Sequence, residues 1–296
     1  TATLDDPNIF VLVDESHRTQ FGSLHAQMRR TLPRACFLGF TGTPVMKRDR
    51  STLERFGGLI DTYTIDEAVA DGAVVPLLYE GRLVQQEVEQ KSIDQWFERY
   101  TRGLSREQAA DLKRKFATAD QLGRTEQTIM RTAWDISEHF SKNFKHTPFK
   151  GQLVAPSKAD ALLYKKYLDQ FGEVTSEVLI SPPDDREGHE DVDEVRDAAE
   201  RPRVLDFWKS MMTRYRDEES YQKEIIDAFK KTETPAILIV VDKLLTGFDA
   251  PLNSVLYLTR KLQDHKLLQA IARVNRQYEG KEYGLIVDYR GVHTKL

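Results

Sequence analysis

Cysteine is nearly absent from this sequence, since Cys36 is the only one in 296 residues. A disulfide or a cysteine-based zinc site needs at least a second thiol, so both are excluded within one chain. Cys36 lies in the apolar run Ala35–Leu38, and we expect its thiol to belong to the core. This cysteine usage fits a reducing compartment, and the predicted location is the cytoplasm.

Long apolar segments are also missing. No run reaches the roughly 18–20 residues that a membrane-spanning helix requires. The N-terminal residues Thr1–Asn8 lack the basic start and the apolar core of a signal peptide. Hydrophobic residues still make up 40% of the sequence, which at this length is enough for one large core or two ordinary ones.

An excess of positive charge is the third absence. The 43 Lys and Arg residues are outnumbered by 47 Asp and Glu residues, which gives a formal net charge of −4. Without a global basic field, any DNA-binding track must be local. The basic run Lys113–Lys115 is either such a track or a solvated helix face. The acidic stretch 182–195 lacks the spacing of a calcium-binding loop, and we expect a surface loop there.

A phosphate-binding loop is missing as well, because no G-x-x-x-x-G-K-[ST] pattern occurs. The acidic segment that normally accompanies it is present: Ile9–His17 reads IFVLVDESH. The apolar run predicts a strand buried on both faces of a parallel sheet. Asp14 and Glu15 follow at its carboxyl end, where open α/β sheets bind ligands. One carboxylate can hold Mg²⁺ and the other can orient water, as in nucleotide hydrolases.

Apolar strands alternate with helical segments along the chain, which predicts an α/β fold with parallel or mostly parallel sheets. In the helical middle of the chain, roughly 90–147, an apolar stripe predicts a helix that faces the core. The stripe consists of Ile129, Ala133, Ile136 and Phe140. Two groups of predicted strands flank this middle: Ile9–Val13, Cys36–Phe40 and 77–84 in the first, and 151–155, 177–181, 236–241, 254–258 and 283–288 in the second.

Hydroxyl-bearing residues follow predicted strands in both groups. The turn Thr41-Gly-Thr43-Pro comes directly after Cys36–Phe40 and can place two hydroxyls beside the acid pair. Such a turn is either a nucleotide sensor or simple punctuation of the chain. Ser157 follows another predicted strand and is suited to cap the next helix.

The segment LLTGFDAP follows the apolar strand at 236–241. Gly247 would permit close approach of the backbone to a phosphate. Thr246 offers a hydroxyl, and the carboxylate of Asp249 suits a ribose or a neighbouring arginine.

The segment His265–Arg276 reads HKLLQAIARVNR and predicts a helix. On that helix Gln269, Arg273 and Arg276 would share one face, opposite an apolar face. The two arginines serve either solubility or the binding of a triphosphate, for which planar guanidinium donors are well suited.

In order along the chain, Asp-Glu-x-His, Thr-Gly-Thr-Pro, Thr-Gly-x-Asp and Gln-x-x-x-Arg-x-x-Arg resemble motifs II, III, V and VI of helicase superfamily 2. The phrases VLVDESHRTQFG, FLGFTGTP, FGGLIDTYTIDEAV, QLVAPSKADA, VVDKLLTGFDAP and LLQAIARVNR are similar to HsdR, the motor and nuclease subunit of type I restriction enzymes. This resemblance implies two RecA-like lobes that use ATP and Mg²⁺ to translocate duplex DNA. It also implies modification and specificity subunits as partners.

The resemblance assigns roles to the motif residues one by one. Asp14 matches the Mg²⁺-binding acid and Glu15 the base that activates water. Asp249 matches a nucleotide-side acid, and Arg273 and Arg276 match the arginine fingers of the second lobe. Residues expected to couple nucleotide and DNA states are His17, Thr41, Thr43 and Gln269. Residues expected to contact the DNA backbone are Ser157 and Thr246.

The departures from the family pattern predict an internal piece of a longer polypeptide, because the P-loop, the nuclease domain and the C-terminal helical region are missing. The expected division is a first, incomplete lobe at 1–88, a helical linker or insertion at 89–147, and a second lobe at 148–296 with a polar insertion near 182–220. This piece alone is expected to hydrolyse ATP poorly or not at all. The alternatives are a generic superfamily 2 helicase or remodeller fragment, and a non-catalytic nucleic-acid-binding or assembly module.

Overall fold

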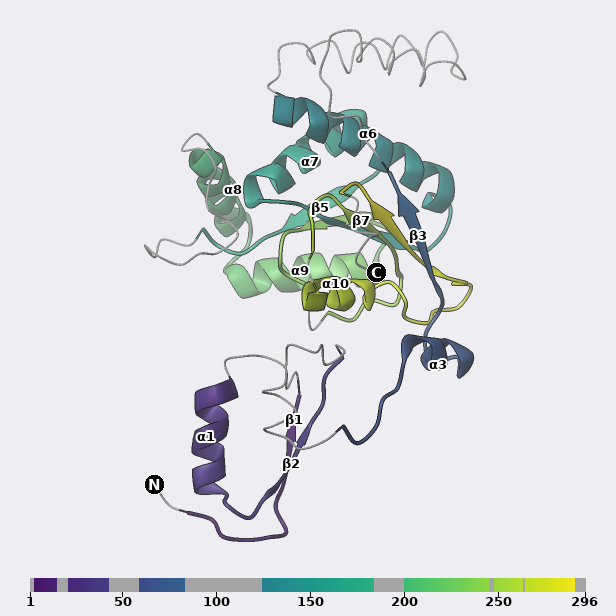
Figure 1. The fold of residues 1–296 in the computed structure, drawn as a ribbon. Helices are drawn as coiled ribbons and strands as arrows, with labels where there is room; N and C mark the ends of the chain where they lie inside the picture. The colour runs from purple at the N-terminus through teal and green to yellow at the C-terminus, as the bar shows by residue number, and fades with distance from the viewer. Residues whose placement is uncertain are drawn as a thin grey trace, which may run out of the picture. The chain divides into compact units, whose positions relative to one another are not determined.

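The computed structural model contains two sheets, in separate units of the chain (Figure 1). The first unit comprises residues 1–72 with 264–269, and the second comprises 73–263 with 270–296. The structure describes residues 3–14, 21–42, 59–82, 124–183, 200–244, 248–262 and 264–290.

The first unit contains one strand–helix–strand motif. Strands β1 (Phe10–Val13) and β2 (Cys36–Gly39) pair in parallel, and helix α1 (Phe21–Thr31) connects them. Two parallel neighbours require such a crossover. The short helix α3 (Ile65–Ala70) begins at Thr64, whose hydroxyl accepts a hydrogen bond from the Glu67 backbone N–H at 3.2 Å.

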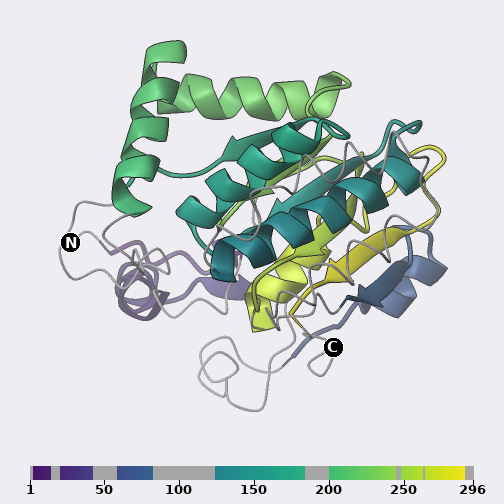
Figure 2. The same ribbon diagram turned by 90° about the horizontal axis from the view of Figure 1, so that it is seen from above.

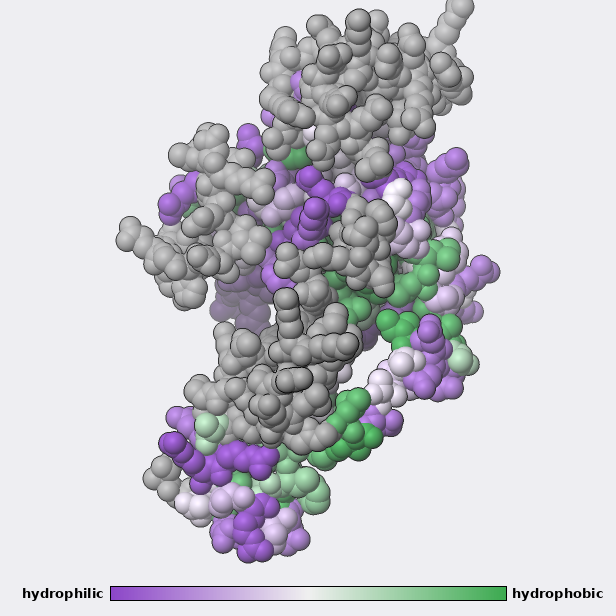
Figure 3. All heavy atoms as spheres, in the orientation of Figure 1, coloured by the Kyte–Doolittle hydropathy of each residue, from purple (hydrophilic) through white to green (hydrophobic). Residues whose placement is uncertain are grey.

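Only one face of the β1–β2 pair is buried. Val13 and Phe37 are 3% and 5% exposed, whereas Phe10 and Leu12 are 68% and 65% exposed. Cys36 pairs with Phe10 on the exposed face, so the prediction of a core thiol is wrong. The predicted burial of β1 on both faces is wrong as well, because side chains alternate across a strand and those of Phe10 and Leu12 lie on the exposed face. Figure 3 shows hydrophobic residues, coloured green, on the surface of the molecule.

The second unit contains a six-stranded sheet in which every strand pair is parallel, as the alternation of strands and helices predicted. Four of its strands are buried along their whole length, which is typical of a parallel sheet covered by helices. In spatial order the strands are β3 (Leu77–Gly81), β8 (Gly284–Asp288), β7 (Asn253–Leu258), β4 (Lys150–Val154), β6 (Ile237–Val240) and β5 (Ser176–Leu179).

Helices cover both faces of this sheet (Figure 1). Helices α6 (Arg124–Phe144) and α7 (Lys158–Phe171) lie side by side on one face, as Figure 2 also shows, and α9 (Glu218–Lys231) lies on the other. Helix α8 (Glu200–Arg214) contacts α7 and α9. The apolar stripe predicted for the middle of the chain is confirmed, because Ile129, Ala133, Ile136 and Phe140 on α6 are all at most 5% exposed.

Strand β3 belongs to the second sheet. Residues 77–84 were expected to close the first group of strands, but β3 pairs with β8 in parallel, and that expectation is wrong. The division of the chain falls between Gly72 and Ala73, ahead of this strand. By pairing with β3, the backbone of β8 gains hydrogen-bond partners that it would lack as an open edge of the sheet. This gain is the physical reason that β3 joins the second sheet.

Polar side chains hold β3 against its neighbours. Arg82 donates to Asp135 on α6 at 2.7 Å and to Glu80 at 2.8 Å. Tyr289, which follows β8, donates to the same Asp135 carboxylate at 2.6 Å. Because Arg82 and Asp135 are mostly buried, this ion pair is stronger than an exposed one.

Lys150 provides a test of the core of the second unit. Its ammonium, in a residue only 4% exposed, donates to the carbonyls of Thr232, Glu233 and Pro235 at 2.5–2.9 Å. Lys150→Met leaves these carbonyls without their donor, and we expect the free energy of unfolding to fall by about 2–4 kcal/mol. Urea denaturation measures this.

The matched control is Lys165→Met, which removes a lysine with a 26% exposed side chain that pairs with Asp169 one helical turn away. Such surface pairs contribute about 0.5 kcal/mol or less. Equal losses for the two substitutions would show that the buried carbonyls do not depend on Lys150.

His139 on α6 makes the second unit sensitive to acid. Burial, and then the Arg82 guanidinium, lower the pKa of His139 below its usual 6.5, although the Glu80 carboxylate opposes this. The ring also bonds the Tyr257 hydroxyl at 2.8 Å. Since the unfolded chain then binds the proton more readily, unfolding free energy should fall as pH drops through about 6.5.

His139→Gln removes this titration, so its unfolding free energy should vary less with pH between about 7 and 5. Urea denaturation at a series of pH values measures the slope. His146→Gln is the control, because it makes the same chemical change at an exposed position. An unchanged slope in the His139 variant would contradict the assignment.

Candidate functional site

The structure describes about half of the residues predicted to form the site. Those it describes are Asp14, Thr41, Ser157, Asp249, Gln269, Arg273 and Arg276. Those outside the described residues are Glu15, His17, Thr43, Thr246 and Gly247, together with the basic run at 113–115.

In the first unit, Asp14 and Thr41 come to the same edge of the sheet. Asp14 directly follows β1, and Thr41 lies two residues after β2. The backbone N–H of Phe40 donates to the Val13 carbonyl at 2.8 Å, which keeps the two chain ends in register. Asp14 is exposed, so its carboxylate faces solvent at the carboxyl end of the sheet, where ligands of such folds bind.

In the second unit, the two predicted arginines are both hydrogen-bonded to the segment that follows β6. Arg276 forms an ion pair with Asp249 through Nη1 and Oδ1. Arg273 donates from Nη1 to the backbone carbonyl of the adjacent Phe248. The structure therefore brings together two motifs through contacts between residues 25 and 27 positions apart in the sequence. Of the two partners considered for Asp249, a ribose and an arginine, it provides the arginine.

Phe248 is a firm anchor for Arg273 because its side chain is only 3% exposed. Its ring lies 6.0 Å from that of Phe229 on α9. The ammonium of Lys230 lies 5.3 Å above the same ring, at cation–π distance. The carbonyl that receives the Arg273 guanidinium thus belongs to a residue fixed by core contacts.

The helix predicted for His265–Arg276 is shorter than expected. Helix α10 (Asp264–Ile271) ends before both arginines, so the prediction that they share a helix face with Gln269 is wrong. The backbone then continues in tighter turns, with hydrogen bonds from residue i to residue i−3. The Arg273 N–H donates to the Ala270 carbonyl at 3.1 Å, and the Val274 N–H donates to the Ile271 carbonyl at 3.0 Å.

The segment after α10 is held by the second unit's own backbone. Arg276 forms an antiparallel bridge with Val74, and Val75 donates its N–H to the Asn275 carbonyl at 2.7 Å. Sequence reasoning missed Val74 and Val75, because neither has a chemical signature. It also missed Gly284, although a glycine at the start of a predicted strand is a signal of close backbone approach.

Ser157 caps α7, as the sequence predicted. Its hydroxyl accepts a hydrogen bond from the Asp160 N–H at 3.0 Å. The hydroxyl proton is left for another acceptor, since a serine hydroxyl both accepts and donates. Further along the same carboxyl edge, Arg260 pairs with Asp242 at 2.5 Å and Arg290 donates to the Thr259 carbonyl at 2.8 Å.

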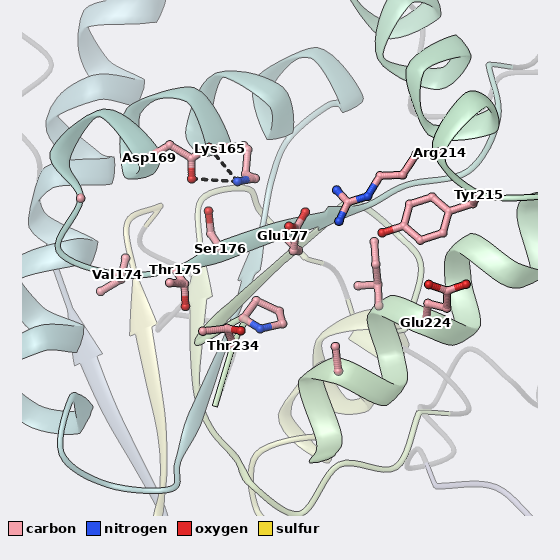
Figure 4. A pocket seen from close by; sticks show the side chains of 14 residues that line it. Lys165, Asp169, Val174, Thr175, Ser176, Glu177, Arg214, Tyr215, Glu224 and Thr234 are labelled. Atoms are coloured by element: carbon pink, nitrogen blue, oxygen red, sulfur yellow. Dashed lines mark hydrogen bonds and ion pairs between the residues drawn. The ribbon is translucent and has the colours of Figure 1, made fainter. Parts of the chain in front are cut away.

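A pocket of about 610 Å³ lies beside strand β5, and its described lining residues include none of those predicted for the site (Figure 4). Ser176 lines it with a hydroxyl that is buried and has no hydrogen-bond partner. Glu177 and Arg214 also line it, and Figure 4 shows the Lys165–Asp169 ion pair at its rim. Its mixed charges select no single class of ligand.

Within the part of the chain that the structure describes, no three His, Cys, Asp or Glu side chains form a group that could hold a metal ion. Over the same residues, none of the helices is both long enough and apolar enough to span a membrane.

Comparison with known proteins identifies the fold. Residues 1–110 match the family model of the SWI2/SNF2 ATPase, and residues 149–291 match that of type I restriction enzyme subunit R domain 3. A fragment of an HsdR subunit from Vibrio vulnificus YJ016 superimposes with a TM-score of 0.55 at 18% identity, over 97% of this chain and 44% of that one. The chain has the RecA-like α/β fold of helicase motors.

Similarity in sequence is more specific. The chain is 35% identical to the MjaIXP endonuclease subunit of Methanocaldococcus jannaschii over 99% of its own length and 26% of that protein. It is 31% identical to the HindI endonuclease subunit of Haemophilus influenzae over 98% and 27%. Both relatives are named as type I restriction enzyme subunits. This chain is thus a homologue of type I restriction endonuclease (HsdR) subunits and spans about a quarter of their length.

The Asp249–Arg276 pair should contribute little to stability, because the two side chains are 62% and 36% exposed. We expect a double-mutant cycle with Asp249→Asn and Arg276→Gln to give a coupling free energy of about 0.2–1 kcal/mol. Urea denaturation of the four proteins measures it. A coupling free energy of several kcal/mol would show that the pair is a structural element, so that losses of activity in these variants would reflect unfolding.

Proposed function

We propose that this chain is the ATP-dependent motor portion of a type I restriction endonuclease R subunit, which couples ATP hydrolysis to translocation of duplex DNA. Cleavage would then follow at a nuclease site outside these residues. The observation that carries the proposal is the anchoring of Arg273 and Arg276 on Phe248 and Asp249. This arrangement presents two guanidinium groups from one short segment, which supports the arginine-finger roles that the resemblance to motif VI implies.

The acidic residue of the proposal that the structure describes is Asp14, which directly follows β1. Asp14 fits a Mg²⁺ site because it is an exposed carboxylate at this edge, and Mg²⁺ is usually held by only one or two protein carboxylates. Bound Mg²⁺ would neutralise charge on the phosphates of ATP. Glu15 would orient the attacking water, and the roles of His17, Thr41, Thr43 and Gln269 in coupling stay predictions.

The arginines would act on the phosphoryl group in transfer. A guanidinium offers planar donors that match phosphate oxygens, and its charge is always present. Arg276 would exchange its partner Asp249 for the nucleotide, and Arg273 would stay fixed through the Phe248 carbonyl. Gly247 would allow the backbone to approach a phosphate.

DNA contacts would be to the phosphate backbone, with Ser157 and Thr246 among the contacting residues. Binding would therefore be indifferent to sequence and weaken with salt. The similar structure of the ATP-dependent Type ISP restriction-modification enzyme LlaBIII, solved bound to DNA, has a TM-score of 0.52 at 14% identity over 97% of this chain and 18% of that one. Modification and specificity subunits would be the protein partners, in the cytoplasm.

The test is Arg273→Ala and Arg276→Ala in the complete protein, assayed for DNA-stimulated ATP hydrolysis. Loss of an arginine finger should lower kcat on the order of a thousandfold, because the finger stabilises charge that develops in the transition state. Arg216→Ala is the matched control, since this arginine side chain is 91% exposed on a turn between helices.

Unchanged ATP turnover in both finger variants would overturn the proposal. If the finger variants lose ATP turnover but the unaltered complete protein cleaves no DNA, a generic helicase or remodeller would be favoured. No turnover in the unaltered protein would favour the non-catalytic module. Residues 1–296 alone should hydrolyse ATP poorly, because they contain no P-loop.

A further inference from the structure

The segment Arg273–Arg276 is not helical, so something other than helix geometry must fix its arginines. Its side chains bind Phe248 and Asp249, but the Asp249 pair is exposed to solvent and therefore weak. The positions of the guanidinium groups therefore also depend on the backbone that carries them.

That backbone is enclosed from one side by the chain that enters the second unit. Val75 donates its N–H to the Asn275 carbonyl at 2.7 Å, and Val74 pairs with Arg276 in an antiparallel bridge. The next residue, Pro76, accepts a hydrogen bond from the N–H of Gly284 at 2.9 Å. The same short stretch thus holds both the arginine segment and the start of β8.

Gly284 encloses the segment from the other side. A Cβ at this position would lie 2.7 Å from the carbonyl carbon of Val274, closer still to its oxygen, and 3.2 Å from the Asn275 nitrogen. Side chains essentially never approach backbone atoms so closely, and Val274 cannot move easily because it is fully buried. Only glycine allows the two backbones to lie this close.

We propose that Gly284 is a positioning residue for the arginine pair: its missing side chain lets the Val274–Asn275 backbone lie between β8 and Val75, and this contact sets where Arg273 and Arg276 point. The inference rests on the proposed function, in which both arginines act on the nucleotide. Gly284 itself touches no substrate.

The test is Gly284→Ala in the complete protein, assayed for DNA-stimulated ATP hydrolysis. A methyl group must displace the Val274–Asn275 backbone and with it the arginines. Since fingers act mainly in the transition state, we expect kcat to fall at least about tenfold while KM for ATP changes less than about threefold. Thermal unfolding should show a folded protein at the assay temperature. An unchanged kcat overturns the proposal.

The matched control is Gly81→Ala on the neighbouring edge strand β3. There the new Cβ would meet only the Tyr79 side chain, at 3.6–3.9 Å, which is ordinary contact. This variant makes the same chemical change one strand away, and its kcat should stay within about twofold of the unaltered protein. An equal loss in both glycine variants overturns the proposal.

A combined variant separates positioning from a general structural effect. In the Arg273→Ala, Arg276→Ala background, Gly284→Ala should cause no further loss of kcat, because residues that act as a unit are not additive. A multiplied loss would mean that Gly284 acts elsewhere. If the two arginine variants themselves retain full turnover, the proposed function has failed; if only Gly284→Ala does, the positioning alone has failed.

Should Gly284→Ala not fold, Val75→Pro gives a second test. It removes the N–H that binds Asn275 and places the proline Cδ against that carbonyl, so it disturbs the same contact while Gly284 is unaltered. The same fall in kcat with little change in KM is expected. Full turnover in this variant would overturn the proposal.

Discussion

The structure of the second unit depends on burial of a parallel sheet on both faces. Strands β4, β6, β7 and β8 are buried along their whole length, so their backbone groups have no access to water and must pair with one another. The pairing is parallel throughout, so all six strands run in one direction. It thereby gathers the ends of β6, β7 and β8 at a single edge, where the charged side chains of Asp242, Arg260 and Arg290 lie.

The two edge strands of this sheet are stabilised in different ways. At one edge, β3 is only partly buried and is fastened by Arg82 to Asp135 and by Asp135 to Tyr289. At the other edge, α9 approaches β5, and the Tyr221 hydroxyl donates to the Val178 carbonyl at 2.6 Å. The second contact satisfies a backbone carbonyl near the edge strand, a group that an open edge can leave unpaired. The first ties a strand distant in sequence to the lobe that carries the arginines.

The proposed nucleotide-facing arginines illustrate how such a site is built. A helix would have placed Gln269, Arg273 and Arg276 on one face through its own geometry. Instead the helix stops at Ile271, and the arginines take their positions from Val75, Gly284 and the Phe248 carbonyl. These contacts join four segments that are far apart in the chain, so a change at any of them can reach the arginines.

The sequence by itself determined the α/β class, the place of each strand within the described residues to within a few positions, and the family resemblance. Strand patterns such as Ile237–Val240 are continuous apolar runs, and Ser157 is a local cap, so neighbouring residues suffice to specify them. Pairing was different. Only the tertiary structure decided that β3 joins β8, that Cys36 faces outward and that α10 ends early. The reason is physical: these outcomes depend on backbone contacts between distant segments, and a backbone N–H or a missing Cβ leaves no pattern in a single sequence.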